Sequence, residues 1–334
     1  MVMTISKFVF LLLFQFSLVF DQSLESPKAS PRIKSQQKNK SFKRPTAANI
    51  ILKSTDGGQT WQDISEGLPE NLQADSFIEK DSELYIRAGN GIYHNKPNSQ
   101  APFWRKEIYP DQPSSIVPGS TAIFAYNYGG QFLQRINGTS LWLPMLTNFP
   151  TRQARTVFEN GSTVFIGCDS GLFKSTDGGK IWRQVYTGGR VMKLVAADGV
   201  LMATSQSGIL RSADDGENWD NVINEGGIGI AIERIKGGFA AITYNTASET
   251  RRVRVSYDGG KIWQPIDGGL PASLSIASII QFGEYFLCGH PTGIFRSSDK
   301  GKTWTLLLPS IESKVFDLSV SGNVIYAMPK NGGC

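Results

Sequence analysis

Residues 175–182 read Ser-Thr-Asp-Gly-Gly-Lys-Ile-Trp, and the pattern Ser-x-Asp-x-Gly-x-x-Trp occurs five times in this chain. The other four copies cover residues 54–61, 212–219, 256–263 and 297–304. Alternating apolar residues precede each copy, and another short extended run follows it. Alternation on both sides of a Gly-containing turn is typical of a β-hairpin. Each copy is therefore predicted to join two antiparallel strands.

The residue types in this motif suit a tight turn. An Asp side chain can accept hydrogen bonds from backbone N–H groups, here expected two residues on, and so fix the turn. The Gly supplies a positive φ, and the Trp begins the next strand with a large packing face. One carboxylate per turn offers too few oxygens for calcium. We therefore assign a structural role, and no metal, to the motif aspartates: Asp56, Asp177, Asp214, Asp258 and Asp299.

The seven tryptophans extend the repeat beyond the five visible copies. They are spaced by 43, 38, 40, 37, 44 and 41 residues, close to the length of a four-stranded propeller blade. Trp104 and Trp142 fall in register, although the aspartate is missing before each of them. The spacing predicts an all-β fold, a seven-bladed β-propeller, in which these two tryptophans mark blades whose turn motif has been lost.

The two ends of the folded part are expected to share one blade. Residues 315–320 and 324–328 resemble first and second strands, whereas residues 50–53 and 61–64 resemble third and fourth strands. Joining these halves would close the ring within this chain and remove exposed sheet edges. We predict that the propeller covers residues 49–334.

The N-terminal region has a different composition. Residues 8–20 form a mostly apolar run after Lys7, which predicts a signal peptide over residues 1–20, with a retained anchor as the alternative. Residues 21–48 are rich in Ser, Pro, Lys and Gln and are expected to be a disordered basic linker. We therefore expect a secreted, periplasmic or cell-envelope protein. The linker is either a solvated spacer or a weak contact to an anionic surface.

Charge and chemistry exclude several functions. Residues 1–48 carry eight basic and two acidic side chains, so the remainder has a formal charge of −1 and does not suit nucleic acid. The two histidines, His94 and His290, are far apart in the repeat series, and no phosphate loop or nucleophile elbow is present. The three cysteines offer no disulfide framework, and buried unpaired thiols are expected. We predict no cofactor, no metal and no catalytic residue.

The five motifs together resemble the Asp-box (BNR-repeat) propeller superfamily over residues 49–334. That superfamily includes sialidases, xyloglucan-active endoglucanases, sortilin-type receptors and the photosystem II stability and assembly factors. The last group is most similar in outline, with one seven-bladed unit, an export signal and terminal closure, and it implies a non-catalytic docking surface. The resemblance to sialidases is weaker because the nearest stretch to their Arg-Ile-Pro motif, residues 31–34, lacks the proline after Ile33. Xyloglucan-active enzymes place their substrate between two propellers.

Ligand sites of propellers usually lie on the face opposite the motif turns. Aligning the repeats places a mixed set of polar side chains on that face, and we take these as candidate ligand-binding residues: Arg87, Asn90, Tyr126, Asn127, Arg155, Asp169, Arg190, Gln206, Tyr244 and His290. Asp169 is the only carboxylate among them, whereas a glycosidase needs a pair. We therefore expect a monomeric, exported, non-catalytic propeller that binds a protein or a cell-surface glycan. The alternative is a glycoside hydrolase, sialidase-like or glucan-directed.

Overall fold

The computed structural model describes residues 48–332, apart from residues 71, 82, 89–90, 96–103, 108–114, 120–121, 137–138, 140, 146 and 151–152. The described residues belong to one compact unit. The predicted signal peptide (1–20) and the predicted linker (21–48), except for Ala48, lie outside the described residues. No described helix is long and apolar enough to cross a membrane.

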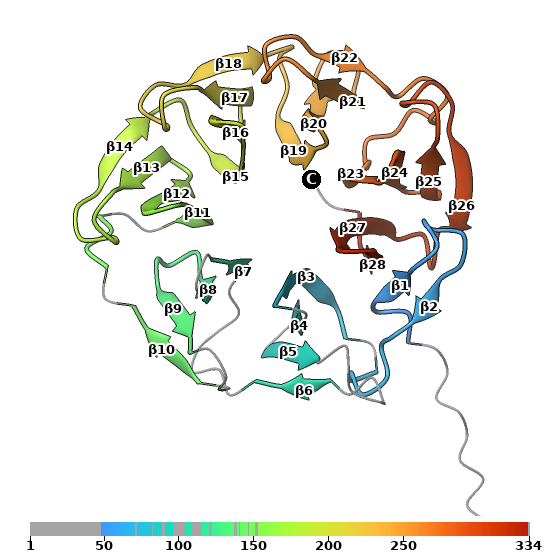
Figure 1. Cartoon of the computed structure of the whole chain (residues 1–334), viewed down its shortest axis with the longest axis horizontal. Coiled ribbons are helices and arrows are strands. Elements are labelled where there is room, and N and C mark those ends of the chain that lie inside the picture. The colour runs from blue at the N-terminus through green and yellow to red at the C-terminus, as the bar shows by residue number, and fades with distance from the viewer. Residues whose placement is uncertain are drawn as a thin grey trace, which may run out of the picture. The chain divides into compact units, whose positions relative to one another are not determined.

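The described strands form seven four-stranded antiparallel sheets around a common centre (Figure 1). In blades 1 to 6 the strands follow one another outwards in chain order. Blades 1 to 3 comprise β3 (Ala74–Lys80), β4 (Glu83–Ala88), β5 (Gly91–Asn95) and β6 (Arg105–Lys106); β7 (Ser115–Pro118), β8 (Ile123–Tyr126), β9 (Phe132–Arg135) and β10 (Trp142–Pro144); and β11 (Ala154–Asn160), β12 (Thr163–Cys168), β13 (Gly171–Ser175) and β14 (Arg183–Tyr186).

Blades 4 to 6 repeat this arrangement. They comprise β15 (Val191–Ala197), β16 (Val200–Ser205), β17 (Gly208–Ser212) and β18 (Asp220–Ile223); β19 (Gly229–Ile235), β20 (Gly238–Asn245), β21 (Thr250–Ser256) and β22 (Gln264–Pro265); and β23 (Ser278–Phe282), β24 (Tyr285–His290), β25 (Gly293–Ser297) and β26 (Thr305–Pro309).

The seventh sheet, which we call the closing blade, is built from both ends of the described chain. Its inner strands are β27 (Val315–Ser321) and β28 (Val324–Lys330), and its outer strands are β1 (Leu52–Ser54) and β2 (Gln62–Asp63). β1 pairs antiparallel with β28, with Leu52 opposite Ala327. The predicted seven-bladed fold and its closure by terminal strands are thus confirmed.

The Asp-box turns have closely similar hydrogen bonds in all five copies. In the fourth blade Ser212 donates its hydroxyl to Asp214 Oδ1 at 2.7 Å and accepts the Gly216 N–H at 2.9 Å. Asp214 Oδ1 accepts the backbone N–H groups of Glu217 and Asn218, at 3.1 and 3.0 Å. The carboxylate therefore binds amides three and four residues on, and not two residues on as expected. The side chain spans the whole turn because Gly216, at φ +80°, folds the backbone back towards it.

The tryptophans pack between neighbouring blades, and their indole N–H groups have two kinds of partner. Four of them donate to the carbonyl of the glycine in their own box: Trp61, Trp182, Trp219 and Trp263. Three donate to the preceding blade instead: Trp104 to Ile64 O, Trp142 to Glu107 Oε2 and Trp304 to Ile266 O. The two blades without a box therefore use the tryptophan to join neighbouring sheets.

A buried ionic network joins the same two blades, 1 and 2. Arg135 of β9 binds the buried Glu107 carboxylate through Nε at 3.3 Å and Nη2 at 3.2 Å. His94 stacks on Tyr85 and lies 3.0 Å from Glu83 Oε2 and 3.4 Å from Glu107 Oε1. Burial lowers the pKa of His94 despite the two carboxylates. Glu107, Arg135 and His94 thus provide polar contacts between two blades that lack the box.

The hydrophobic core lies between adjacent blades, where inner and second strands of one sheet pack on the next. Phe165, Phe239 and Phe286, in the second strands of blades 3, 5 and 6, are almost completely buried. Burying such a side chain contributes about 1.5–3 kcal/mol relative to exposing it. Cys168 and Cys288 are buried and unpaired, as expected, and burial raises the pKa of the Cys288 thiol. Cys334 lies outside the described residues.

Candidate functional site

The candidate site lies on the face of the propeller opposite the Asp boxes, which we call the open face. It is formed by the turns that join second to third strands and by the connections between blades. Asp169 follows β12, Gln206 follows β16, and Arg155 and Arg190 lie at or just before the first strands of blades 3 and 4. These positions are far apart in the sequence but belong to adjacent blades.

Asp169 is the centre of a cluster of four side chains. It accepts hydrogen bonds from Arg155 Nε at 2.7 Å and Nη2 at 3.1 Å, a bidentate contact. It also accepts Arg190 Nε at 3.1 Å and the hydroxyl of Tyr128 at 2.8 Å. These donors hold the pKa of Asp169 at about 2, chiefly through the hydrogen bond from Arg155. The carboxylate is therefore fixed and ionised at neutral pH.

Two tyrosines hold Arg155 in position. The guanidinium of Arg155 lies 4.6 Å from the ring centroid of Tyr128, within the range of a cation–π contact. Behind it, the hydroxyl of Tyr126 donates to the Arg155 backbone carbonyl at 2.8 Å. Burial raises the pKa of Tyr126 to about 12, so this hydroxyl keeps its proton at neutral pH. Tyr126 was expected on this face from its repeat position, but nothing in the sequence showed that it contacts Arg155.

The cluster retains a positive charge and remains open to solvent. Two guanidinium groups face one carboxylate, which leaves a formal charge of +1. The side chains of Arg155 and Arg190 are 36% and 44% exposed. Arg190 contacts Asp169 through Nε alone, so its two terminal NH2 groups are not needed for that bond. The arrangement therefore suits a ligand with carboxylate or other hydrogen-bond acceptor groups.

A hollow of about 560 Å³ lies beside this cluster. Its lining includes the predicted residues Arg87, Tyr126, Asn127 and Arg155, together with Asp75, Ser76, Ser115, Ala154 and Tyr128. Arg87 of β4 forms an ion pair with Asp75 of the neighbouring strand β3, and both line this hollow. Asn127 fixes the turn after β8, since its Oδ1 accepts the Gln131 N–H at 3.0 Å. The structure thus brings four predicted residues from blades 1 to 3 into one depression.

A second hollow of about 590 Å³ shares Asp75 with the first and extends over the closing blade. Its lining includes Glu70, Glu312, Lys314 and Lys330. One carboxylate was expected on this face from the repeat alignment, and the structure adds Glu70, Asp75 and Glu312. Asp75 holds the same place at the start of its innermost strand as Arg155 does, because Ala74 and Ala154 are paired alike before a register shift. This matching repeat position is the sequence signal that could have identified Asp75 as a residue of the open face.

The remaining predicted residues lie elsewhere on this face. Gln206 is exposed, and its N–H donates to the Arg190 carbonyl at 2.9 Å, which places it beside the cluster. Tyr244, near the end of β20, is half-buried and lines neither hollow. His290 is buried, with Nδ1 2.8 Å from Thr292 Oγ1 and Nε2 3.0 Å from Pro271 O, and burial lowers its pKa. Asn90 lies outside the described residues.

Local hydrogen bonds lower the pKa of several described carboxyl groups. The pKa is lowered for Asp169, for the box aspartates and for Glu312. A glycosidase general acid needs the opposite shift. Within the described ranges, no group of three or more His, Cys, Asp or Glu side chains is placed to hold a metal ion.

Comparison with known proteins agrees with this architecture. A family model described as BNR/Asp-box repeat matches residues 52–63, the first box and its flanking strands. No curated protein matches. The chain is therefore a seven-bladed β-propeller with Asp-box repeats, and the resemblance inferred from the five motifs is confirmed.

Three solved structures illustrate the range of similar propellers. YCF48 bound to D1 peptide is 11% identical, with a TM-score of 0.58, over 85% of this chain and 98% of that one. A GH74 xyloglucanase from Xanthomonas campestris is 13% identical, with a TM-score of 0.60, over 81% and 53%. The extracellular domain of a protein named as a hybrid two component system from B. thetaiotaomicron is 12% identical, with a TM-score of 0.64, over 79% and 38%. At these identities the likeness establishes the fold alone.

Proposed function

We propose that this chain is an exported, non-catalytic propeller that binds a protein partner on its open face, around Asp169. The observation that carries the proposal is the cluster itself: two arginines and a tyrosine are held on one carboxylate beside an open hollow. Side chains fixed in this way lose little conformational entropy when a ligand binds. Arginine and tyrosine are also the residue types that most often dominate protein interfaces.

The charge of the cluster favours a partner that presents acceptor groups. The terminal NH2 groups of Arg190 suit the paired oxygens of a carboxylate. Tyr128, 48% exposed, adds an aromatic surface next to them. One similar propeller, YCF48, is described as bound to a peptide, and another is an extracellular domain. These two descriptions support a binding role and an exported location, without assigning a partner to this chain.

A pull-down from the cell-envelope fraction tests this proposal. The bait is the propeller purified as the wild type, as Arg155→Ala/Arg190→Ala, and as Lys236→Ala. Lys236 is the control because it is an exposed basic residue that pairs with Glu284 at the turns of the opposite face. Loss of an interface arginine costs about 1–3 kcal/mol, so we expect about tenfold or weaker partner binding for the double variant only. Equal capture by all three proteins would overturn the proposal.

Glycoside hydrolysis remains the alternative because Glu70, Asp75 and Glu312 line one hollow. Two of these carboxylates are already engaged: Asp75 pairs with Arg87, and Lys314 binds Glu312 at 2.7 Å and lowers its pKa. Glu70 is then the residue to test. If the purified chain released product from a panel of fluorogenic glycosides that includes sialosides, and Glu70→Gln abolished that release, the non-catalytic proposal would be wrong.

A further inference from the structure

One contact between neighbouring blades recurs three times with the same geometry. A basic side chain directly before the box serine donates to the backbone carbonyl directly after the box aspartate of the next blade. The three contacts are Lys174 Nζ to Asp215 O at 2.8 Å, Arg211 Nε to Gly259 O at 2.7 Å, and Arg296 Nη1 to Gly57 O at 3.1 Å. A charged donor to a carbonyl is stronger than a neutral one, so this contact holds adjacent blades together near the box.

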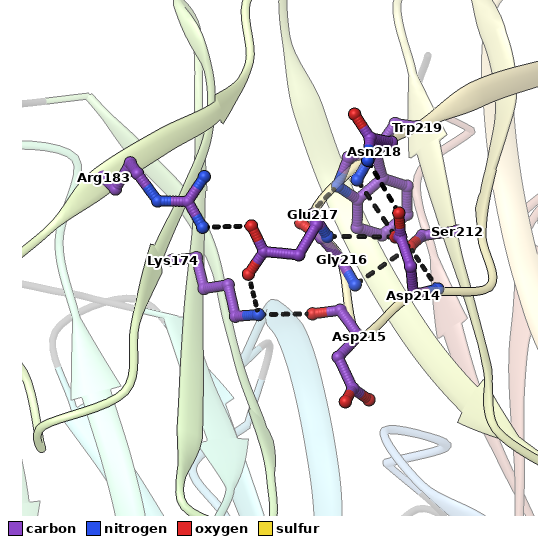
Figure 2. A network of polar contacts seen from close by, with 9 residues as sticks. All are labelled: Lys174, Arg183, Ser212, Asp214, Asp215, Gly216, Glu217, Asn218 and Trp219. Carbon is purple, nitrogen blue, oxygen red and sulfur yellow. Dashed lines mark hydrogen bonds and ion pairs between the residues drawn. The ribbon is translucent and has the colours of Figure 1, made fainter.

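Figure 2 shows the first of these contacts in its surroundings. The Lys174 ammonium bridges Asp215 O and the carboxylate of Glu217, at 2.8 and 2.6 Å, and Arg183 binds the second oxygen of Glu217. Glu217 belongs to the turn that Asp214 organises. The basic residue therefore depends on the folded shape of the next box, because the carbonyl it binds is positioned by that turn.

The third contact differs in what it joins. Arg296 and Gly57 are separated by 239 residues, and Gly57 lies between β1 and β2, the N-terminal half of the closing blade. That half is held by few backbone pairs: β1 pairs with β28 at three positions and with β2 at two. The Arg296 guanidinium is oriented by Tyr285, whose ring centroid lies 4.7 Å away. The Lys174 and Arg211 contacts instead join blades that follow each other in the chain.

We propose that Arg296 is the closing latch of the propeller. It holds residues 50–65 in the closing blade, so that loss of its contact opens the ring at this segment while the other six blades stay folded. The same contact at Arg211 does not have this effect, because the chain joins β21, which precedes Gly259, directly to its partner strand β20, whereas β1 has no such connection to its partner strand β28. Opening at this segment also disturbs the open face, since Asn49 and Ile50 line its larger hollow.

Hydrogen exchange measured by mass spectrometry on the full chain tests the latch. We compare the wild type with Arg296→Met, Arg296→Lys and the matched control Arg211→Met. In Arg296→Met the amides of residues 52–64 are expected to exchange about tenfold faster, while those of blades 2 to 5 are unchanged. Arg211→Met is expected to alter exchange near residues 256–262 only. Arg296→Lys is expected to restore protection, because Lys174 makes the same contact in blade 3.

Two outcomes would overturn the proposal. One is unchanged exchange over residues 52–64 in Arg296→Met, and the other is equal acceleration there in Arg211→Met. Should Arg296→Met fail to fold, the wild type in low concentrations of urea decides the question. The latch then requires residues 52–64 to exchange through an opening with a smaller urea dependence than global unfolding. Exchange of this segment only by global unfolding would contradict it.

Discussion

At the scale of single residues, local hydrogen bonds fix the carboxylates of the box aspartates. Asp56 accepts the Thr60 N–H at 2.9 Å and the Thr60 hydroxyl at 2.6 Å, and Ser54 donates to it at 2.8 Å. These donors stabilise the ionised form and hold the pKa of Asp56 at about 2, below its ordinary 3.8. Asp299 is held at about 2 by the matching contacts of Thr303.

Because of this pKa shift, the free energy of unfolding depends on pH. A carboxyl whose pKa is lower in the folded state contributes stability above pH about 4 and loses it as the pH falls towards 2. We expect the urea midpoint of the wild type to fall between pH 5 and pH 2, and to fall less steeply in Asp56→Asn. Asp215→Asn is the control because the Asp215 carboxylate makes none of the turn contacts (Figure 2). If the urea midpoint fell equally steeply with pH in Asp56→Asn and in the wild type, Asp56 would not contribute to the loss of stability in acid.

At the scale of strands, glycines at the start of third strands let the fourth strand approach. Gly171, Gly208 and Gly293 have φ values of +135°, +124° and +142°. A Cβ on Gly208 would lie 1.7 Å from the Ile223 carbonyl oxygen of β18. The pairing of β17 with β18 shifts register just beyond this point, between Ile209 and Leu210. The outer strand β18 thus ends in direct contact with the backbone of Gly208, where a side chain would not fit.

Gly208→Ala is therefore expected to be strongly destabilising, by about 3 kcal/mol, because strain at positive φ adds to a clash with backbone. Gly199→Ala in the same blade is the matched control. Gly199 has φ +75°, but a Cβ added there would meet no atom within 4 Å, so only the conformational cost of about 1 kcal/mol applies. Urea unfolding followed by tryptophan fluorescence measures both. Similar losses in the two variants would show that the close approach of Ile223 does not matter.

At the scale of the whole molecule, closure depends on two strands that are not joined in the chain. β28 and β1 pair as second and third strands do in the other blades, and their register brings Lys330 and Asn49 to the same side of the closing blade. In blade 3 the corresponding strands, β12 and β13, are linked by two residues. The closing blade therefore has the geometry of a hairpin whose turn is missing.

A circular permutant tests this geometry. Joining residue 330 to residue 49 through Asn-Gly and opening the chain between Gly268 and Gly269 is expected to give a folded propeller with nearly wild-type thermal stability. The new turn replaces a long-range pairing by a local one. Circular dichroism and thermal unfolding measure the outcome. A permutant that aggregates or melts without cooperativity would show that the two strands do not meet as a hairpin.

The fold class, the number of blades and the way the ring closes could all be predicted from the sequence. Those features follow from local chemistry repeated along the chain: an Asp-box turn between alternating strands, and one tryptophan in each blade. The same local patterns placed the candidate residues on the open face. They predicted the aspartate hydrogen bonds one or two residues too early, because the folded path of the turn is not visible in residue spacing.

Which of those residues meet depends on the tertiary structure. Arg155, Asp169 and Arg190 come from two adjacent blades, and Asp75 pairs with Arg87 of the neighbouring strand at a register shift in blade 1. His290, chosen by its repeat position, is buried on Thr292 and Pro271. The physical reason is that contacts between blades depend on their stagger and on side-chain direction, which no periodic pattern along a single strand records.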